Sequence, residues 1–193
     1  MCGRYYIEIS DEELREISKS AQNRAELSYR DMSVEMKKEG EIYPSNVVPV
    51  ITSDGIFPMK WGFEMAGKKL LINARFETWG SKQTYKNCKL CLVPASGYYE
   101  WKADTDPKVK FKFYLEGQSL FLAGLYRQKD DDIPKFVILT REAVGEAAEI
   151  HHRMPVILPS KVVPEKLDYS DMITDLTITE ADRPTGQISF DII

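Results

Sequence analysis

The segment from residue 108 to 113 (KVKFKF) alternates strictly between charged and apolar side chains. Successive side chains of a β-strand point to opposite faces of its sheet, so this pattern predicts a strand with one solvated face and one core face. The sheet that contains this strand is therefore exposed on one side and packed on the other.

Other short segments predict further strands. Residues 47–52 and 56–63 flank Ser53-Asp54-Gly55, which is a strong hairpin signal. Because Pro49 and Pro58 each lack a backbone donor, we expect these two strands to lie at a sheet edge or to carry bulges. The remaining strands that we predict cover residues 2–9, 70–76, 88–94, 97–101, 119–126, 136–139, 176–179 and 188–193.

Helices are fewer. Ser10 and Glu13 form a plausible capping box for one helix, and Thr140 is expected to cap another that runs to Ala148. We also predict a short helix over residues 77–86, with Thr78 as a cap, and a loose helix or helix pair over 22–41. Many short strands with few helices indicate an α+β fold. We expect one domain, residues 1–193, dominated by curved, barrel-like antiparallel sheet with a few peripheral helices.

Composition limits the function. The formal net charge of −4 argues against a protein that coats duplex DNA, so any nucleic-acid site must be a local basic groove. No stretch has the length and apolarity of a membrane span, and no signal peptide is visible, so we expect a cytoplasmic protein without membrane contacts. Three cysteines do not make a disulfide framework.

The first five residues (MCGRY) place a cysteine directly after the initiator methionine. If Met1 is removed, Cys2 carries a free α-amine, which titrates near about 8, beside a thiol that titrates near about 8.5. The neutral amine attacks an aldehyde, and the thiol closes on the imine to form a thiazolidine ring. The alternative is that Cys2 is simply a small apolar residue that opens a strand.

Other residues suggest chemistry less directly. Cys88 and Cys91 have CxxC spacing, but residues three apart on a strand face opposite ways and no second CxxC completes a zinc site, so we interpret them as core thiols. His151 is the first of two adjacent histidines, and an imidazole suits acid–base work near neutrality. Glu100 lies in an aromatic segment and faces the same way as Tyr98, so burial is expected to raise its pKa.

Several motifs occur together in a fixed order. They are residues 1–5 (MCGRY), 61–62 (WG), 73–78 (NARFET), 94–101 (PASGYYEW), 123–126 (AGLY) and 151–155 (HHRMP). Each motif is weak alone, but as a set, across nearly the whole chain, they resemble the SOS-response-associated peptidase (SRAP) family, also described as abasic-site processing proteins. The resemblance implies that the protein recognises abasic sites in single-stranded DNA and forms a covalent crosslink to them.

The resemblance also implies a catalytic set. Cys2 is then the nucleophile and the crosslinked residue, and Asn73 positions the cysteine or the sugar by hydrogen bonding. Glu100 moves protons during ring opening and imine formation, while His151 assists ring opening or stabilises the developing alkoxide. The electrophile is the aldehyde of the ring-opened abasic sugar.

The implied DNA-binding set is Arg75 and Arg153, which hold the flanking phosphates, with Arg4 as a weaker candidate for the same task. Trp61 is expected to stack on a base beside the lesion. No cofactor or metal is implied. We expect a monomer that is nucleoid-associated when it is bound to damaged DNA.

Two other functions remain open from the sequence. One is an N-terminal-nucleophile cysteine peptidase or hydrolase that acts on peptides, which the family's older name suggests and which self-removal of Met1 would fit. The other is a small zinc or redox protein that uses Cys88 and Cys91. An imine at the sugar also permits β-elimination, so a DNA-crosslinking protein of this kind is expected to be able to act as a lyase as well.

Overall fold

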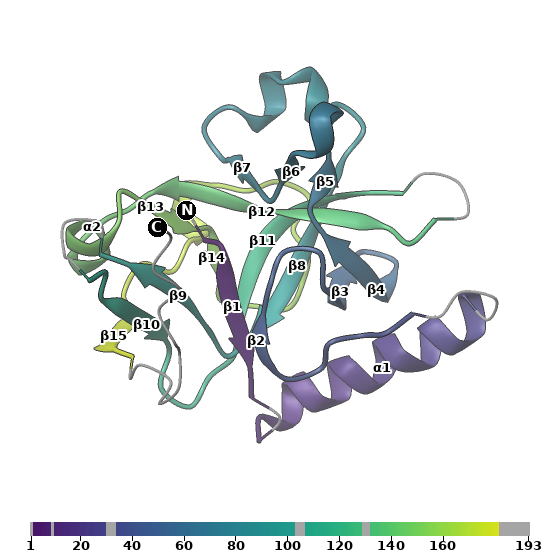
Figure 1. The fold of residues 1–193 in the computed structure, drawn as a ribbon, viewed down its shortest axis with the longest axis horizontal. Helices are drawn as coiled ribbons and strands as arrows, with labels where there is room; N and C mark the ends of the chain where they lie inside the picture. Colours follow the sequence, from purple (N-terminus) through teal and green to yellow (C-terminus); the bar gives the residue numbers. More distant parts are fainter. Residues whose placement is uncertain (1, 9, 30–33, 103–106, 129–131, 182–193) are drawn as a thin grey trace, which may run out of the picture.

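A computed structural model describes residues 2–8, 10–29, 34–102, 107–128 and 132–181, and shows two large sheets and a small two-stranded one, with a long helix along one side (Figure 1). The elements are β1 (Arg4–Ile7), α1 (Glu12–Ser28), β2 (Gly40–Ile42), β3 (Val47–Thr52), β4 (Gly55–Trp61), β5 (Phe63–Glu64), β6 (Leu70–Leu71), β7 (Asn73–Arg75), β8 (Lys89–Ala95), β9 (Gly97–Trp101), β10 (Lys110–Tyr114), β11 (Leu120–Arg127), β12 (Lys135–Glu142), α2 (Glu146–Ile150), β13 (Arg153–Pro155), β14 (Ile157–Leu158) and β15 (Thr177–Glu180). Four 3-10 turns complete them, η1 (Ala66–Lys68), η2 (Trp79–Ser81), η3 (Gln83–Tyr85) and η4 (Tyr169–Asp171).

The larger sheet closes on itself. Strand β12 pairs with β4 in parallel and with β11 in antiparallel fashion, and β4–β3, β3–β8 and β8–β11 complete a ring. Leu92, Leu122 and Ile138 have no exposed surface and belong to the core of the molecule. The α+β, barrel-like fold predicted from the sequence is confirmed.

A second sheet has the order β15-β10-β9-β1-β2, so β1 lies between two hydrogen-bonded neighbours. The alternation in β10 is confirmed, since Phe113 is buried at 1% exposure while the lysines point outward. Lys110 lies 3.7 Å from the ring centroid of Tyr99, and Lys112 lies 4.5 Å from that of Tyr6. The solvent face of this sheet is therefore a layer of tyrosines covered by cationic side chains.

The proline-bearing hairpin forms as predicted, but its strands are not at an edge, because β3 lies between β4 and β8. The reason is the register, which places Pro49 opposite Pro58. The amide of Lys60, two residues from Pro58, donates out of the hairpin to Pro134 at 2.8 Å. By strand alternation, the proline nitrogens also point out of the β3–β4 ladder, so no hydrogen bond between these strands is lost.

Helix α1 begins one residue later than the capping box suggested. Asp11, not Ser10, is the N-cap, and its carboxylate accepts a hydrogen bond from the amide of Leu14 at 3.2 Å. The helix buries Leu14, Ile17, Ala21 and Ala25 at helical spacing. It ends at Ser28, so the loose helix predicted over residues 22–41 is correct only for its first part.

Three further predictions need correction. Thr140 does not cap a helix but lies inside β12, where β7 and β13 pair on either side of it; the helix that follows, α2, begins only after Gly145. Residues 77–86 form η2 and η3, and Thr78 makes no side-chain cap. Residues 70–76 form two short strands, β6 and β7. The strand predicted at 188–193 lies outside the described residues.

Candidate active site around Cys2

Cys2 lies just before β1 and is fully buried. Asn73, at the start of β7, donates a hydrogen bond from its side-chain amide to the Cys2 carbonyl at 2.9 Å. Asn73 is itself 7% exposed, so the bond lies in the interior and is not shared with bulk water. The chain start is therefore held to the barrel by a side chain 71 positions away.

Glu100 reaches the same place from β9. The register pairs Arg4 with Tyr99, so the next position places Glu100 opposite Gly3, next to Cys2. Glu100 is 4% exposed, and burial raises the pKa of its carboxyl to about 7. Burial also raises the pKa of the Cys2 thiol, and the negative charge of Glu100 adds to that effect. A carboxyl that titrates near neutrality thus lies beside a thiol.

His151 stands two residues before β13, which pairs with β12 on the side opposite to β7. Its Nδ1 accepts a hydrogen bond from the backbone amide of Arg153 at 3.0 Å, and its ring stacks on that of His152 at 4.4 Å. Burial lowers the pKa of the imidazole, which favours its neutral form. The Arg153 carbonyl oxygen also lies 3.2 Å from Nδ1, so the role of this nitrogen depends on the tautomer. When Nδ1 accepts from the Arg153 amide, the proton of the neutral ring is on Nε2.

The structure joins Cys2, Asn73 and Glu100 through direct contacts or register, and places His151 two residues before β13, a strand of the same sheet as Asn73. Tyr5 and Tyr98 were not among the site residues expected from the sequence. They lie on β1 and β9, the strands that carry Cys2 and Glu100 into the site, and their buried hydroxyls make no hydrogen bond within the described residues. The alternation that places Tyr98 on the same face of β9 as Glu100 was the available signal.

The three arginines expected to bind phosphate are in different situations. Arg75 is exposed and forms no ion pair among the described residues. Arg153 is 8% exposed and makes a bidentate pair with Glu77, both bonds at 2.8 Å, as well as a hydrogen bond to the Thr140 carbonyl. Arg4 pairs with Glu41 at 3.1 Å. Of these three arginines, Arg75 alone has a guanidinium without an ion pair among the described residues.

Trp61 is not at the surface. Its side chain has no exposed area, packs against Tyr5 and Phe136, and donates from its indole nitrogen to the Ile72 carbonyl at 3.0 Å. The expectation that Trp61 stacks on a DNA base does not fit this position. Its ring instead supports Tyr5 from within the core.

The CxxC cysteines do not form a centre of their own. Cys91 is fully buried in β8, Cys88 is half-buried just before it, and both are free thiols. Within the described residues, no group of three or more His, Cys, Asp or Glu side chains is arranged to hold a metal. Among those residues there is also no helix with the length and apolarity needed to cross a membrane.

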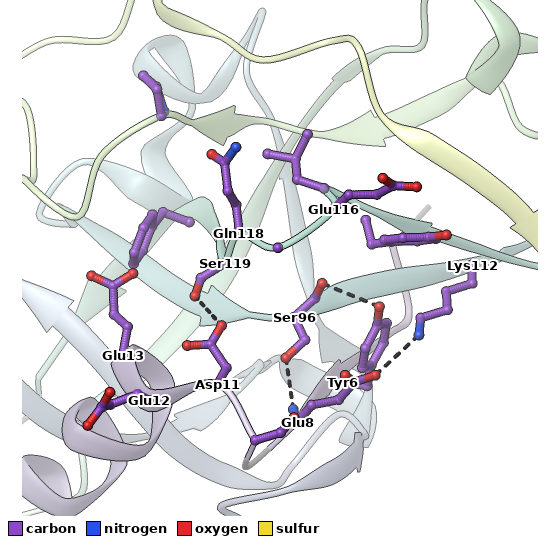
Figure 2. A pocket seen from close by; sticks show the side chains of 16 residues that line it. Tyr6, Glu8, Asp11, Glu12, Glu13, Ser96, Lys112, Glu116, Gln118 and Ser119 are labelled. Carbon is purple, nitrogen blue, oxygen red and sulfur yellow. Dashed lines mark hydrogen bonds and ion pairs between the residues drawn. The ribbon is translucent and has the colours of Figure 1, made fainter.

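A large hollow lies at the other end of β1 from Cys2 (Figure 2). It has a volume of about 760 Å³ and is lined by Glu8, Asp11, Glu12, Glu13 and Glu116 among others. Lys112 pairs with Glu8 there, and Ser119 donates to Asp11. A cavity with this many carboxylates repels a phosphate backbone, so its size does not make it the nucleic-acid site.

The site thus places a buried cysteine beside a carboxyl of near-neutral pKa, on a closed barrel flanked by a second sheet. The profile of the SOS response associated peptidase (SRAP) family matches residues 1–187. The chain belongs to this family.

Named relatives agree with this assignment. The abasic site processing protein YoqW of Bacillus subtilis is 34% identical over 146 residues, which cover 62% of this chain and 65% of YoqW. YedK of Escherichia coli, also named an abasic site processing protein, is 31% identical over 119 residues, covering 56% of this chain and 53% of YedK. The matches thus span less than two thirds of these relatives.

A solved structure from Bordetella bronchiseptica shares the fold, with a TM-score of 0.64, 20% identity, and coverage of 94% of this chain and 100% of that one. A protein from Bacteroides thetaiotaomicron gives a TM-score of 0.63 at 18% identity, covering 94% and 92%. At these identities the likeness concerns the fold alone.

Proposed function

We propose that this protein recognises abasic sites in single-stranded DNA and crosslinks itself to them through Cys2 after Met1 has been removed. The observation that carries the proposal is the position of Glu100, buried beside Cys2 with a pKa of about 7. The names of the relatives, abasic site processing proteins, support the choice of substrate.

The steps follow from the chemistry of an aminothiol. The amine of Cys2 attacks the sugar aldehyde to give a carbinolamine, and loss of one water gives the imine. The thiol then passes its proton to Glu100, and its sulfur adds to the imine carbon while the C=N electron pair moves to nitrogen. That nitrogen takes up a proton, and a five-membered thiazolidine results. Glu100 suits this work because its pKa lies near neutral pH.

Asn73 and His151 have supporting tasks. Asn73 fixes the backbone of Cys2 through its carbonyl, which holds the nucleophile in place while the sugar reacts. The Nε2–H of neutral His151 serves as a hydrogen-bond donor to the sugar oxygen released on ring opening. We assign phosphate binding to Arg75, because its guanidinium is exposed, and expect the protein to act as a monomer at damaged DNA in the nucleoid.

The test is an intact mass of the purified protein before and after incubation with a single-stranded abasic oligonucleotide. We expect loss of Met1, then a heat-stable adduct with the mass of protein plus oligonucleotide minus one water. Intact DNA and a Cys2→Ala variant serve as controls. If protein confirmed to start at Cys2 gives no such adduct, the proposal is wrong.

We propose that the same site accounts for the peptidase part of the family name. A thiol and a carboxyl of raised pKa are the groups needed to cleave the Met1–Cys2 bond, and we propose that this self-cleavage is the peptidase activity. The test is production in a system without methionine aminopeptidase. Wild-type protein that keeps Met1 under these conditions contradicts self-cleavage but leaves the crosslinking proposal intact.

A further inference from the structure

Three of the buried polar atoms that lack hydrogen-bond partners within the described residues belong to side chains on the strands that meet near Cys2. They are the hydroxyls of Tyr5 and Tyr98 and the side-chain oxygen of Asn73, and each is buried. A buried polar group without a partner costs free energy, so a fold that keeps several in one place has a reason for them. Of these three atoms only the two hydroxyls can donate, since the Asn73 side-chain oxygen can only accept.

The two tyrosines form one unit. Tyr5 of β1 and Tyr98 of β9 are directly opposite in the register, and both are at most 1% exposed. Tyr98 stacks on Phe113 with centroids 4.6 Å apart, and Tyr5 packs against Trp61 at 5.3 Å. Rings held in this way place their hydroxyls rigidly, which is what preorganised donors require.

The Cys2 sulfur requires stabilisation as a thiolate. The thiolate is the form of cysteine that attacks carbon, but burial raises the pKa of Cys2 and nearby Glu100 raises it further. The Asn73 amide that reaches Cys2 is already bonded to its carbonyl. Burial raises the pKa of both phenols, and the charge of Cys2 acts on each, as expected for hydroxyls close to the sulfur.

We propose that the hydroxyls of Tyr5 and Tyr98 donate hydrogen bonds to the Cys2 sulfur when it becomes a thiolate, and so stabilise it for attack on the imine. In the resting thiol form the sulfur accepts only weakly, which is why the hydroxyls are left without partners. The role rests on the proposed crosslinking reaction. It assigns the pair of tyrosines to the sulfur step, after the imine has formed.

The experiment compares Tyr98→Phe, Tyr5→Phe and the double variant with wild type, all confirmed by mass to start at Cys2. Tyr6→Phe is the matched control, because Tyr6 lies on the opposite face of β1 and its hydroxyl already donates to the Ser96 carbonyl. For each single site variant we expect heat-stable adduct to form about 10- to 100-fold more slowly at saturating abasic DNA. The DNA concentration at half-maximal rate should not change.

Stability separates this role from a structural one. Because the two hydroxyls have no partners to lose, removing either should leave the midpoint of urea unfolding unchanged or raise it. A second readout is the thiol itself. The pKa of Cys2, followed by thiolate absorbance as the difference from a Cys2→Ser variant, should rise in Tyr98→Phe and Tyr5→Phe and stay constant in Tyr6→Phe.

Equal adduct rates and an equal thiol pKa in wild type and the double variant would overturn the inference. So would a rate loss matched by a loss of stability and no change in thiol pKa, since that pattern describes packing alone. If wild type forms no adduct, the proposed crosslinking fails, yet the thiol pKa still decides whether the tyrosines donate to the sulfur.

Discussion

Asn73 holds the backbone of Cys2 through a hydrogen bond that spans 71 positions of sequence, and it does so from the interior. An Asn73→Asp variant keeps the shape of the side chain but turns the donor into an acceptor. We expect crosslinking to slow by about tenfold or more, because the Cys2 carbonyl loses a buried donor. Adduct formed per unit time on a denaturing gel measures this, with exposed Asn87→Asp as the control. Equal rates in the two variants would contradict a positioning role.

Glu100 gives a pH signature. Its pKa is raised to about 7 in the folded protein, against 4.5 ordinarily, so between these values the folded state holds a proton that the unfolded state has lost. Stability should therefore fall as the pH rises from about 4.5 to 7, by roughly 3 kcal/mol in total. Urea unfolding at several pH values should show this fall in wild type and not in Glu100→Gln. Taking the difference between the two removes the opposite contribution of His151, whose pKa is lowered.

Arg75 and Arg153 should separate under mutation. Arg75→Ala removes an exposed cation, so we expect weaker DNA binding, a shallower salt dependence and unchanged stability. Arg153→Ala breaks a partly buried bidentate pair with Glu77, so we expect a loss of about 1–3 kcal/mol of unfolding free energy. Fluorescence anisotropy against salt and urea unfolding measure the two effects. If the two variants behaved alike in both assays, the ion pair with Glu77 would not keep Arg153 from binding DNA.

The Glu77–Arg153 pair also predicts acid sensitivity. The Arg153 guanidinium lowers the pKa of the Glu77 carboxyl from 4.5 to about 2. The stability that the pair contributes is therefore fully present above pH 4.5 and is lost as the pH falls from 4.5 toward about 2. A Glu77→Gln variant should lose stability at pH 7 and differ little from wild type near pH 2. Unfolding curves at the two pH values test this.

Cys2→Ala keeps the α-amine but removes the sulfur. The imine can then form but cannot close to a thiazolidine, so we expect no heat-stable adduct without borohydride, and more strand cleavage by β-elimination. Denaturing gels of the labelled strand with and without borohydride distinguish the products. A heat-stable adduct that forms without borohydride would show that the thiol is not part of the linkage.

Much of the fold was accessible from local patterns. The alternation in residues 108–113 predicted β10, and turn residues Ser53-Asp54-Gly55 predicted the β3–β4 hairpin. The errors came where long-range pairing overrides local signals. Thr140 resembles a helix cap, but strands on both sides extend β12 through it, and Pro49 and Pro58 avoid the edge because the register turns both nitrogens out of the ladder.

For the site, the sequence shows which residues have reactive side chains, but it does not show which of those side chains are already bonded to other residues. Sequence cannot show that Arg153 is bound by Glu77, or that Trp61 lies wholly inside the core, since both depend on packing between distant segments. The role of the pair formed by Tyr5 and Tyr98 could not be predicted from the sequence for a related reason. Its significance is the absence of partners for the Tyr5 and Tyr98 hydroxyls among the described residues, and only a folded structure reveals that.

The place of β1 has a mechanical consequence. In the proposed adduct, tension in the DNA strand reaches the protein at the start of β1. Because β1 is bonded to β9 on one side and β2 on the other, the component of this tension along the strand axis falls on both ladders in shear, and their hydrogen bonds must yield together instead of one after another. The four residues of β1 would thus carry the covalent link through two ladders at once.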